Sequence, residues 1–251
     1  MTHTLNGRSE KELLWYQRRG FLQAAAAWSA AGGFGAAQAQ QRSNIVELVG
    51  DARLNGTRLL PQHSIQTGDE VITGPGATLV FVVGNSSFKV RQNTRMAIER
   101  GSSLFSVSIL RLLSGAVVSA WGKGTTRQIV TPTLTAGIRG TGVYTEIFSR
   151  ESGRTYFCNC YGTVEISSGS DNLISQADYH QAFWANAQPA AGQFLTPAPP
   201  INHGDEELEM LARLVQQRTA WQVMGKRGVK DGKGYMEDKP GQVHPAQPPA
   251  K

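Results

Sequence analysis

The chain has 251 residues, a length that suits one large domain or two small ones; 40% of its residues are hydrophobic and 18% are charged. This composition excludes disorder throughout, and the lack of any run of 18 apolar residues excludes a polytopic membrane protein. The formal net charge is +6, but ten of the 25 basic residues lie in 1–39 and 222–251, which leaves 15 basic and 14 acidic residues in 40–221. Such a neutral body lacks the basic surface that nucleic-acid binding requires.

Residues 1–39 have the pattern of an export signal. Arg18 and Arg19, followed by Phe-Leu and an alanine-rich stretch, resemble a twin-arginine signal, and Ala37-Gln38-Ala39 has the small residues that a signal peptidase accepts. We expect cleavage after Ala39 and a mature periplasmic protein without an integral membrane segment, in an oxidising compartment. Because this route carries folded proteins, a cofactor could be loaded before export. The alternative is a short amphipathic helix, whose many small residues would bury little surface.

Residues 40–168 are predicted to form one β domain. Short alternating runs such as Val80-Phe81-Val82 are separated by turns rich in glycine, and they recur at the spacing that is typical of all-β domains. We expect about ten to twelve strands and a mainly β fold, arranged as a β-sandwich or a short β-solenoid.

Residues 169–221 are predicted to form an extension without regular strands. Its features are His180 near two aromatic residues, a Pro-rich linker that ends at Pro200, and one C-terminal helix over 205–221. Asp205 is the expected N-cap, two glutamates occupy the first turn, and apolar residues follow at helical spacing. The tail 222–251 is basic and rich in Gly, Lys and Pro, so it is predicted to be disordered.

The β region carries an ordered series of short motifs. They are Gly50-Asp51-Ala52-Arg53-Leu54, Gly68-Asp69-Glu70-Val71-Ile72-Thr73, Gly76-Ala77-Thr78-Leu79-Val80-Phe81, Leu113-Ser114-Gly115-Ala116-Val117, and Gly137-Ile138-Arg139-Gly140-Thr141-Gly142-Val143. This order resembles the FecR domain, a periplasmic β-rich module, over about residues 44–168. Arg139-Gly140-Thr141 is the most specific element. We expect it at the start of a strand, where Gly140 allows a tight backbone approach and Arg139 donates to turn carbonyls, so its role is structural.

The resemblance also implies a setting in the cell envelope. The best-known FecR proteins place this domain between a cytoplasmic sigma-regulating segment with a membrane helix and a C-terminal signalling domain that meets an outer-membrane transporter. This sequence departs from that arrangement at both ends, so the resemblance implies the module and not transmembrane signalling. We therefore expect a non-enzymatic periplasmic binding or regulatory module, with an envelope protein or a small ligand as its partner.

One group of residues could carry chemistry. Cys158 and Cys160 are predicted where one strand ends and the next opens, and their i, i+2 spacing places both sulfurs on the same side. His180 and His203 follow in the extension, and the stretch around His203 resembles one found in exported FecR-like proteins that also carry the Cys-x-Cys element. Two thiolates and two imidazoles suit a soft metal such as zinc or copper, or haem iron.

Two other interpretations of the cysteines remain open at this stage. Cys158 and Cys160 could be small buried hydrophobic residues, with the histidines capping or hydrogen-bonding locally, or they could form a redox-active dithiol. Redox-active pairs usually lie at the N-terminus of a helix and not on a strand. Motifs for serine hydrolases, zinc proteases and phosphate loops are absent from the sequence, so we expect no enzyme apart from this thiol-redox alternative.

Overall fold

The computed structural model describes residues 4–5, 8–9, 43–124, 127–149, 153–226 and 228. The chain divides into two compact units, Met1–Gln41 and Arg42–Lys251. In the first unit, the described residues form β1 (Thr4–Leu5) and β2 (Arg8–Ser9), which pair antiparallel. The predicted signal residues Arg18, Arg19, Ala37 and Ala39 lie outside the described residues, and so does the predicted disordered tail beyond residue 228.

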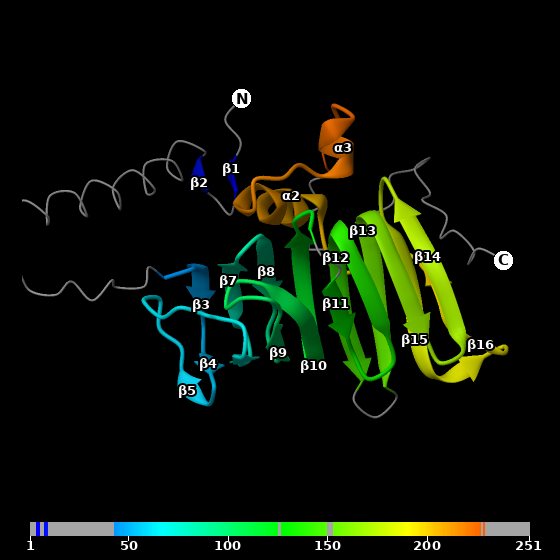
Figure 1. Ribbon diagram of the computed structural model, residues 1–251, viewed down its shortest axis with the longest axis horizontal. Coiled ribbons are helices and arrows are strands. Elements are labelled where there is room, and N and C mark those ends of the chain that lie inside the picture. The colour runs from blue at the N-terminus through cyan, green and yellow to red at the C-terminus, as the bar shows by residue number, and fades with distance from the viewer. Residues whose placement is uncertain are drawn as a thin grey trace, which may run out of the picture. The chain divides into compact units, whose positions relative to one another are not determined.

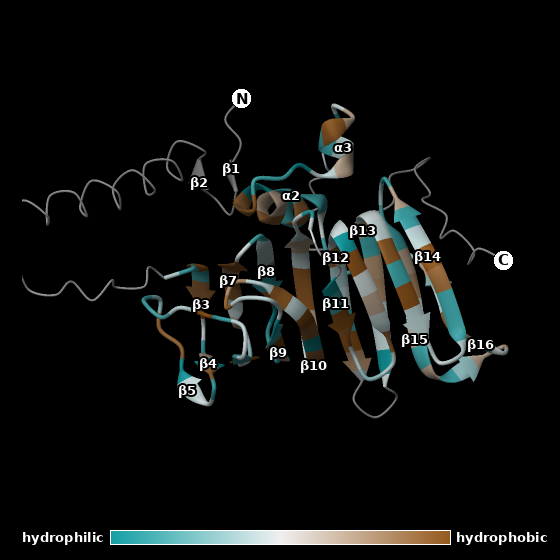
Figure 2. Ribbon diagram, in the orientation of Figure 1, coloured by the Kyte–Doolittle hydropathy of each residue, from teal (hydrophilic) through white to brown (hydrophobic). Residues whose placement is uncertain are grey.

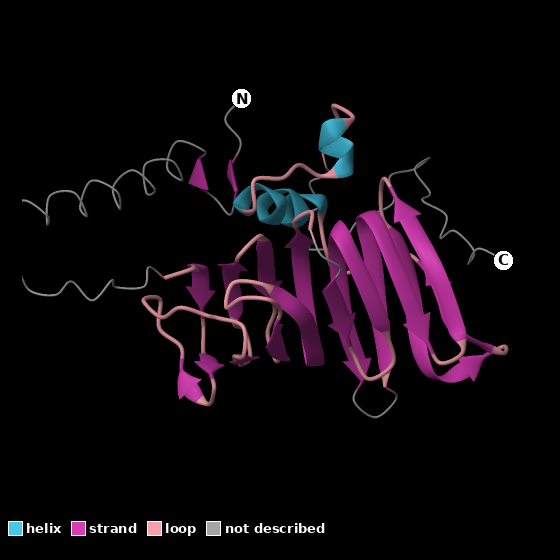
Figure 3. Cartoon of the chain, in the orientation of Figure 1, coloured by secondary structure: helices cyan, strands magenta, loops and turns pink. Residues whose placement is uncertain are grey.

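The second unit is mainly β with helices near its C-terminal end, as the sequence predicts (Figures 1 and 3). Fourteen strands belong to one sheet, and eleven of them, β3 to β13, lie in residues 40–168, within the ten to twelve expected there. They are β3 (Ile45–Val49), β4 (Ala52–Leu54), β5 (Thr57–Arg58), β6 (Glu70–Thr73), β7 (Thr78–Val83), β8 (Ser86–Val90), β9 (Arg95–Arg100), β10 (Val107–Trp121), β11 (Arg127–Val130), β12 (Thr135–Ser149), β13 (Arg154–Ser168), β14 (Asp171–Ala177), β15 (Gln181–Ala190) and β16 (Gln193–Ala198). The helices are α2 (Asp205–Leu214) and α3 (Ala220–Val223).

Three strands of 15 residues each, β10, β12 and β13, contain a glycine in the left-handed region. These are Gly115 (φ +75°), Gly140 (φ +68°) and Gly162 (φ +94°). Each strand changes its hydrogen-bonded neighbours near its glycine: β10 leaves β9 for β8 and β12, β12 leaves β11 for β10, and β13 leaves β15 for β14. Only glycine adopts this backbone conformation without strain, so these positions are the corners at which the sheet folds over.

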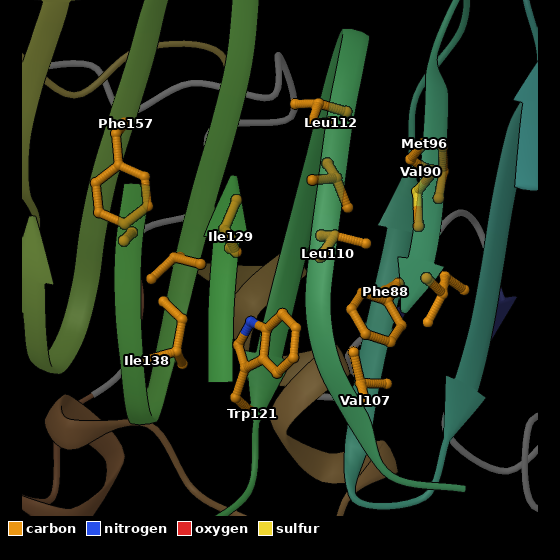
Figure 4. Packing of buried hydrophobic residues seen from close by; sticks show 14 of the residues in the cluster. Phe88, Val90, Met96, Val107, Leu110, Leu112, Trp121, Ile129, Ile138 and Phe157 are labelled. Atoms are coloured by element: carbon orange, nitrogen blue, oxygen red, sulfur yellow. The ribbon is translucent and has the colours of Figure 1, made fainter. Parts of the chain in front are cut away.

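The folded sheet has two layers that face each other across one apolar core. Layer 1 contains β4, β5, β6, β9, β11 and β14, with the first halves of β10 and β12 and the second half of β13; layer 2 contains the remaining strands and half-strands. Leu110 and Ile129 from layer 1 belong to the same buried cluster as Phe88 and Phe157 from layer 2 (Figure 4). Of the two predicted alternatives, the unit therefore has the sandwich arrangement.

A second apolar cluster lies on the outer face of layer 2, beneath the helices. Tyr144 and Tyr156 contribute to it from the sheet, and Leu208, Leu211 and Trp221 contribute from α2 and α3. The alternation of the strands explains both clusters, because neighbouring residues of β12 and β13 point to opposite faces of the layer. Layer 2 is thus buried on both sides in its centre.

The expectation that regular strands end at Ser168 is wrong, because β14, β15 and β16 continue the sheet. β14 alternates between exposed and buried positions, but the hydropathy along the strand does not follow this alternation (Figure 2). Its inward residues include Ser175 and Ala177, which contribute little to an apolar pattern. Pro197 lies in β16, which is an edge strand and tolerates a residue without a backbone donor.

The predicted single helix over 205–221 is also wrong, because α2 ends at Leu214 and α3 is a separate turn. The backbone N–H of Gln216 donates to Arg213 O at 3.0 Å, and that of Gln217 donates to Ala212 O at 2.8 Å. Gln216 itself has a φ of +56°. This is a Schellman arrangement, in which a left-handed residue ends the helix, and it can form without the glycine that usually signals it.

The Arg139-Gly140-Thr141 motif lies inside β12 and not at the start of a strand. Gly140 does adopt a positive φ, as the sequence predicts, but the strand continues through the corner. Arg139 donates to Glu165 Oε1 on β13 at 2.7 Å instead of to turn carbonyls. The side chain of Arg139 is 58% exposed and that of Glu165 is 50% exposed, so this ion pair contributes little to stability.

Candidate metal centre

The two cysteines lie in the middle of β13, on the outer face of layer 2. The sequence analysis placed them between two strands, whereas they belong to one continuous strand with a bulge. Tyr161 pairs with Gly142 and Asn159 pairs with Val143, so Cys160 is an extra residue on β13. Both side chains point into the outer cluster, their sulfurs are 3.8 Å apart, and neither has exposed surface.

His180 lies in the short connection between β14 and β15. Residues 155–159 of β13 pair with β15, and residues 162–168 pair with β14. The connection that carries His180 runs between these two neighbours of β13, next to residue 160. The backbone N–H of His180 donates to Cys160 O at 3.0 Å. Its Nδ1 is 3.5 Å from the sulfur of Cys158, although the two residues are 22 positions apart in the chain. The fold of the sheet therefore places His180 beside the cysteines.

His203 reaches the same point from the segment between β16 and α2. It is fully buried, and its ring stacks on Tyr144 of β12 with a centroid distance of 4.7 Å. Tyr156 holds the preceding segment, since its hydroxyl donates to Pro199 O at 2.9 Å and accepts from the N–H of Ile201 at 3.1 Å. Residues far apart in the sequence thus meet under the N-terminus of α2.

The structure brings together all four residues that the sequence analysis nominated as metal ligands. One ligand atom from each of Cys158, Cys160, His180 and His203 lies within 4.8 Å of the other three, and all four side chains are buried. The measured separations are 3.8 Å between the sulfurs, 3.5 Å from the Cys158 sulfur to His180 Nδ1, and 3.0 Å from His180 Nδ1 to His203 Nε2. Tetrahedral zinc separates two sulfurs by about 3.8 Å, sulfur and nitrogen by about 3.6 Å, and two nitrogens by about 3.3 Å. The arrangement fits a tetrahedral ion.

The second nitrogen of each imidazole has its own acceptor. His180 Nε2 lies 2.9 Å from Asp205 Oδ1, and His203 Nδ1 lies 2.6 Å from Ile201 O. A carbonyl and a carboxylate can only accept, so both of these nitrogens carry the proton of the neutral ring. The lone pairs of His180 Nδ1 and His203 Nε2 then face each other across 3.0 Å. Such a pair of lone pairs repels unless a cation, either a proton or a metal ion, lies between them.

The electrostatics of the site favour positive charge. Burial lowers the pKa of His180, but the charge on Cys158 and the hydrogen bond to Asp205 outweigh it and raise that pKa to about 9. Burial likewise raises the pKa of Cys158, but the hydrogen bond from Cys160 and the charges of His203 and His180 hold it well below its usual value. Burial and the neighbouring Cys158 together raise the pKa of Cys160. Without a metal, these shifts favour a thiolate at Cys158 and an imidazolium at His180.

Asp205 contacts the candidate site, a position that differs from the one expected from the sequence. It was expected as the N-cap of the helix, whereas Gly204 is the N-cap and Asp205 is the first helical residue, fully buried. One carboxylate oxygen accepts from His180, and the other accepts from the Tyr179 hydroxyl at 2.9 Å. Metal-ligating histidines commonly donate to such a carboxylate, which orients the ring. A helix start rich in acids hid this role, because acidic residues there are common on electrostatic grounds alone.

The comparisons with known proteins give limited matches. No protein-family model matches the chain, and no curated protein matches it. Two crystal structures of a proposed anti-sigma factor from Parabacteroides distasonis, at 1.65 Å and 2.50 Å resolution, are similar to it with TM-scores of 0.43 and 0.42 and sequence identities of 9% and 11%. These matches cover 51% and 53% of this chain and span 58% and 60% of the chains that it matches. Among the described residues, no helix has the length and apolar character needed to span a bilayer.

Proposed function

We propose that this chain is a non-enzymatic, exported module of the bacterial cell envelope that holds one structural metal ion, zinc by preference, between Cys158, Cys160, His180 and His203. The ion fastens the β14–β15 connection and the start of α2 to β13. The envelope setting rests on the resemblance of residues 44–168 to the FecR domain and on the signal-like residues 1–39. In that setting the sandwich presents a surface to an envelope protein or a small ligand.

The facing lone pairs of the two histidines carry the proposal. If the four residues were only packed together, either ring could turn or change its tautomer to relieve the repulsion. Asp205 and the carbonyl of Ile201 instead hold both rings with their free nitrogens toward the two sulfurs. A proton between the two nitrogens would relieve their repulsion alone, whereas one metal ion would be a partner for both nitrogens and both sulfurs at once.

The geometry favours a single ion over haem and over redox chemistry. Four donors within 4.8 Å of one another leave room for one ion, whereas haem iron offers only two axial positions to a protein. Two sulfurs and two nitrogens in a tetrahedral arrangement suit zinc better than Cu²⁺, which prefers a square arrangement. A redox-active dithiol must be reached by a partner sulfur, and both cysteine side chains are fully buried.

Metal analysis of the purified chain tests the proposal. We expect one zinc ion per chain and the release of about two protons for each ion that the metal-free chain takes up at pH 7.5, because the Cys160 thiol and the His180 imidazolium must both lose a proton. Calorimetry in buffers with different ionisation enthalpies gives the proton count. A fully folded chain that takes up no zinc, copper or cobalt would eliminate the site.

Export can be tested separately from metal binding. We expect the chain to reach the periplasm with its N-terminus at Gln40, and we expect replacement of both Arg18 and Arg19 with lysine to block transport. Cell fractionation followed by N-terminal sequencing measures both effects. Transport of the double-lysine chain by the same route, or a mature N-terminus at Met1, would contradict the signal assignment.

A further inference from the structure

Trp221 covers the candidate metal centre on the side of α3. Its side chain is 2% exposed, and its ring stacks on His180 with a centroid distance of 5.6 Å and an interplanar angle of 24°. The edges of Tyr161 and Tyr179 also meet it, at 5.7 Å and 5.4 Å between centroids. Burying this large ring stabilises the closed position, and the ring excludes water from the ligands beneath.

The other walls of the site are held far more firmly. Glu207 of α2 forms ion pairs with Lys89 on β8, at 2.6 Å, and with Arg91 just after β8, at 2.7 Å. The hydroxyl of Ser87 on β8 donates to Leu211 O of α2 at 2.7 Å. These partly or fully buried contacts fix α2 on layer 2. The sheet itself provides the floor of the site through β12 and β13.

By contrast, the segment that carries Trp221 has few attachments. α3 is only four residues long, and the N–H of the Trp221 indole donates to Glu209 Oε1 at 2.7 Å. Val223 and Met224 on the same turn are exposed at 68% and 49%. A single helical turn of this length is not stable by itself, so it depends on the contacts of Trp221.

We propose that residues 219–226, called the lid here, control the exchange of the metal ion. The inference rests on the proposed metal site and adds its regulation. All four ligands are buried, so the ion can enter or leave only when part of the structure opens. Segments with few buried contacts open most often, and α3 has fewer contacts with the strands than α2 has. Release therefore follows opening of the lid and does not require unfolding of the sandwich.

The rate of zinc release from the full chain tests the lid. The zinc-loaded chain is mixed with excess 4-(2-pyridylazo)resorcinol, and the coloured zinc complex is followed over time. We expect Trp221→Ala to bind one zinc ion and to release it at least about tenfold faster than the natural chain, while Trp221→Phe gives an intermediate rate. Trp184→Ala is the matched control, since Trp184 belongs to the outer cluster, packs on Tyr156 and on the half-exposed Phe148, and has no ring contact with either histidine among the described residues.

The outcomes separate the lid from the metal site. Faster release from Trp221→Ala than from Trp184→Ala supports the lid. Equal release from both variants, with one zinc ion bound to each, overturns the lid and leaves the metal site standing. A natural chain that takes up no zinc overturns both.

A measurement on the natural chain keeps the test decisive if Trp221→Ala does not fold. The N–H groups of Val223 and Met224 donate within the lid, to Thr219 O at 3.1 Å and Ala220 O at 3.1 Å. We expect deuterium exchange at these amides to give a free energy of opening well below that of the β12 and β13 amides. We also expect the rate of zinc release to depend only weakly on urea at low concentrations. Release that occurs only with unfolding of the whole sandwich would contradict the lid.

Discussion

His203→Ala is expected to lose the bound zinc ion and to melt at a temperature about 10 °C below that of the natural chain when zinc is present. A ligand that binds only the folded state stabilises it by about 4 kcal/mol when its free concentration is a thousand times its Kd. Removing one of four ligands weakens the site enough to forfeit this contribution. Zinc content by elemental analysis and thermal unfolding with and without a chelator measure the two effects.

The control for His203→Ala is His63→Ala. His63 lies in a turn, where its Nδ1 accepts from the N–H of Leu60, and it is not a member of the ligand cluster. We expect His63→Ala to keep its zinc and to lose stability on chelation as the natural chain does, whereas the chelator should leave His203→Ala unchanged. If the two alanine variants held equal zinc and responded equally to the chelator, the four side chains would be packing residues only.

Gly115→Ala is expected to cost about 3 to 5 kcal/mol of unfolding free energy, a large part of the total for a domain of this kind. Gly115 has a φ of +75°, and an added Cβ atom would lie 2.5 Å from Thr94 Cα and 2.8 Å from Asn93 O. Both neighbours are backbone atoms of the turn that crosses the corner of β10, so they cannot move aside cheaply. Urea-induced unfolding measures the loss.

Gly56→Ala is the matched control for the corner. Gly56 has nearly the same φ, +79°, but an added Cβ atom there meets nothing within 4 Å. We expect it to cost about 1 kcal/mol, which is the penalty of the left-handed conformation alone. Gly140→Val should unfold the domain, because a β-branched residue is strongly strained at a φ of +68° and its Cβ atom would also meet the side chain of Lys123 at 3.3 Å. Equal losses for Gly56→Ala and Gly115→Ala would contradict close packing at the corner.

The sequence alone determined the fold class, because alternation of apolar residues and glycine-rich turns are local signals. It also determined that the sulfurs of Cys158 and Cys160 share a face, since that follows from the two-residue period of a strand. Local signals did not predict β14, because its inward positions include Ser175 and Ala177, which are too polar or too small to produce an apolar period. Gln216 ended α2 without a glycine, so nothing local marked the end of the helix.

Only the tertiary structure decided how the four candidate ligands meet and what orients them. His180 is placed by the change of partner along β13, and His203 by the packing of its segment on Tyr144 and Tyr156. Asp205 acquires its role from being buried against His180, although the sequence presents it as an ordinary acidic residue at the start of a helix. Residue type and spacing can nominate ligands, but the distance between residues far apart in the chain depends on how the sheet folds at its glycine corners. The same folding leaves Trp221 over the site, where no periodicity in the sequence could have placed it.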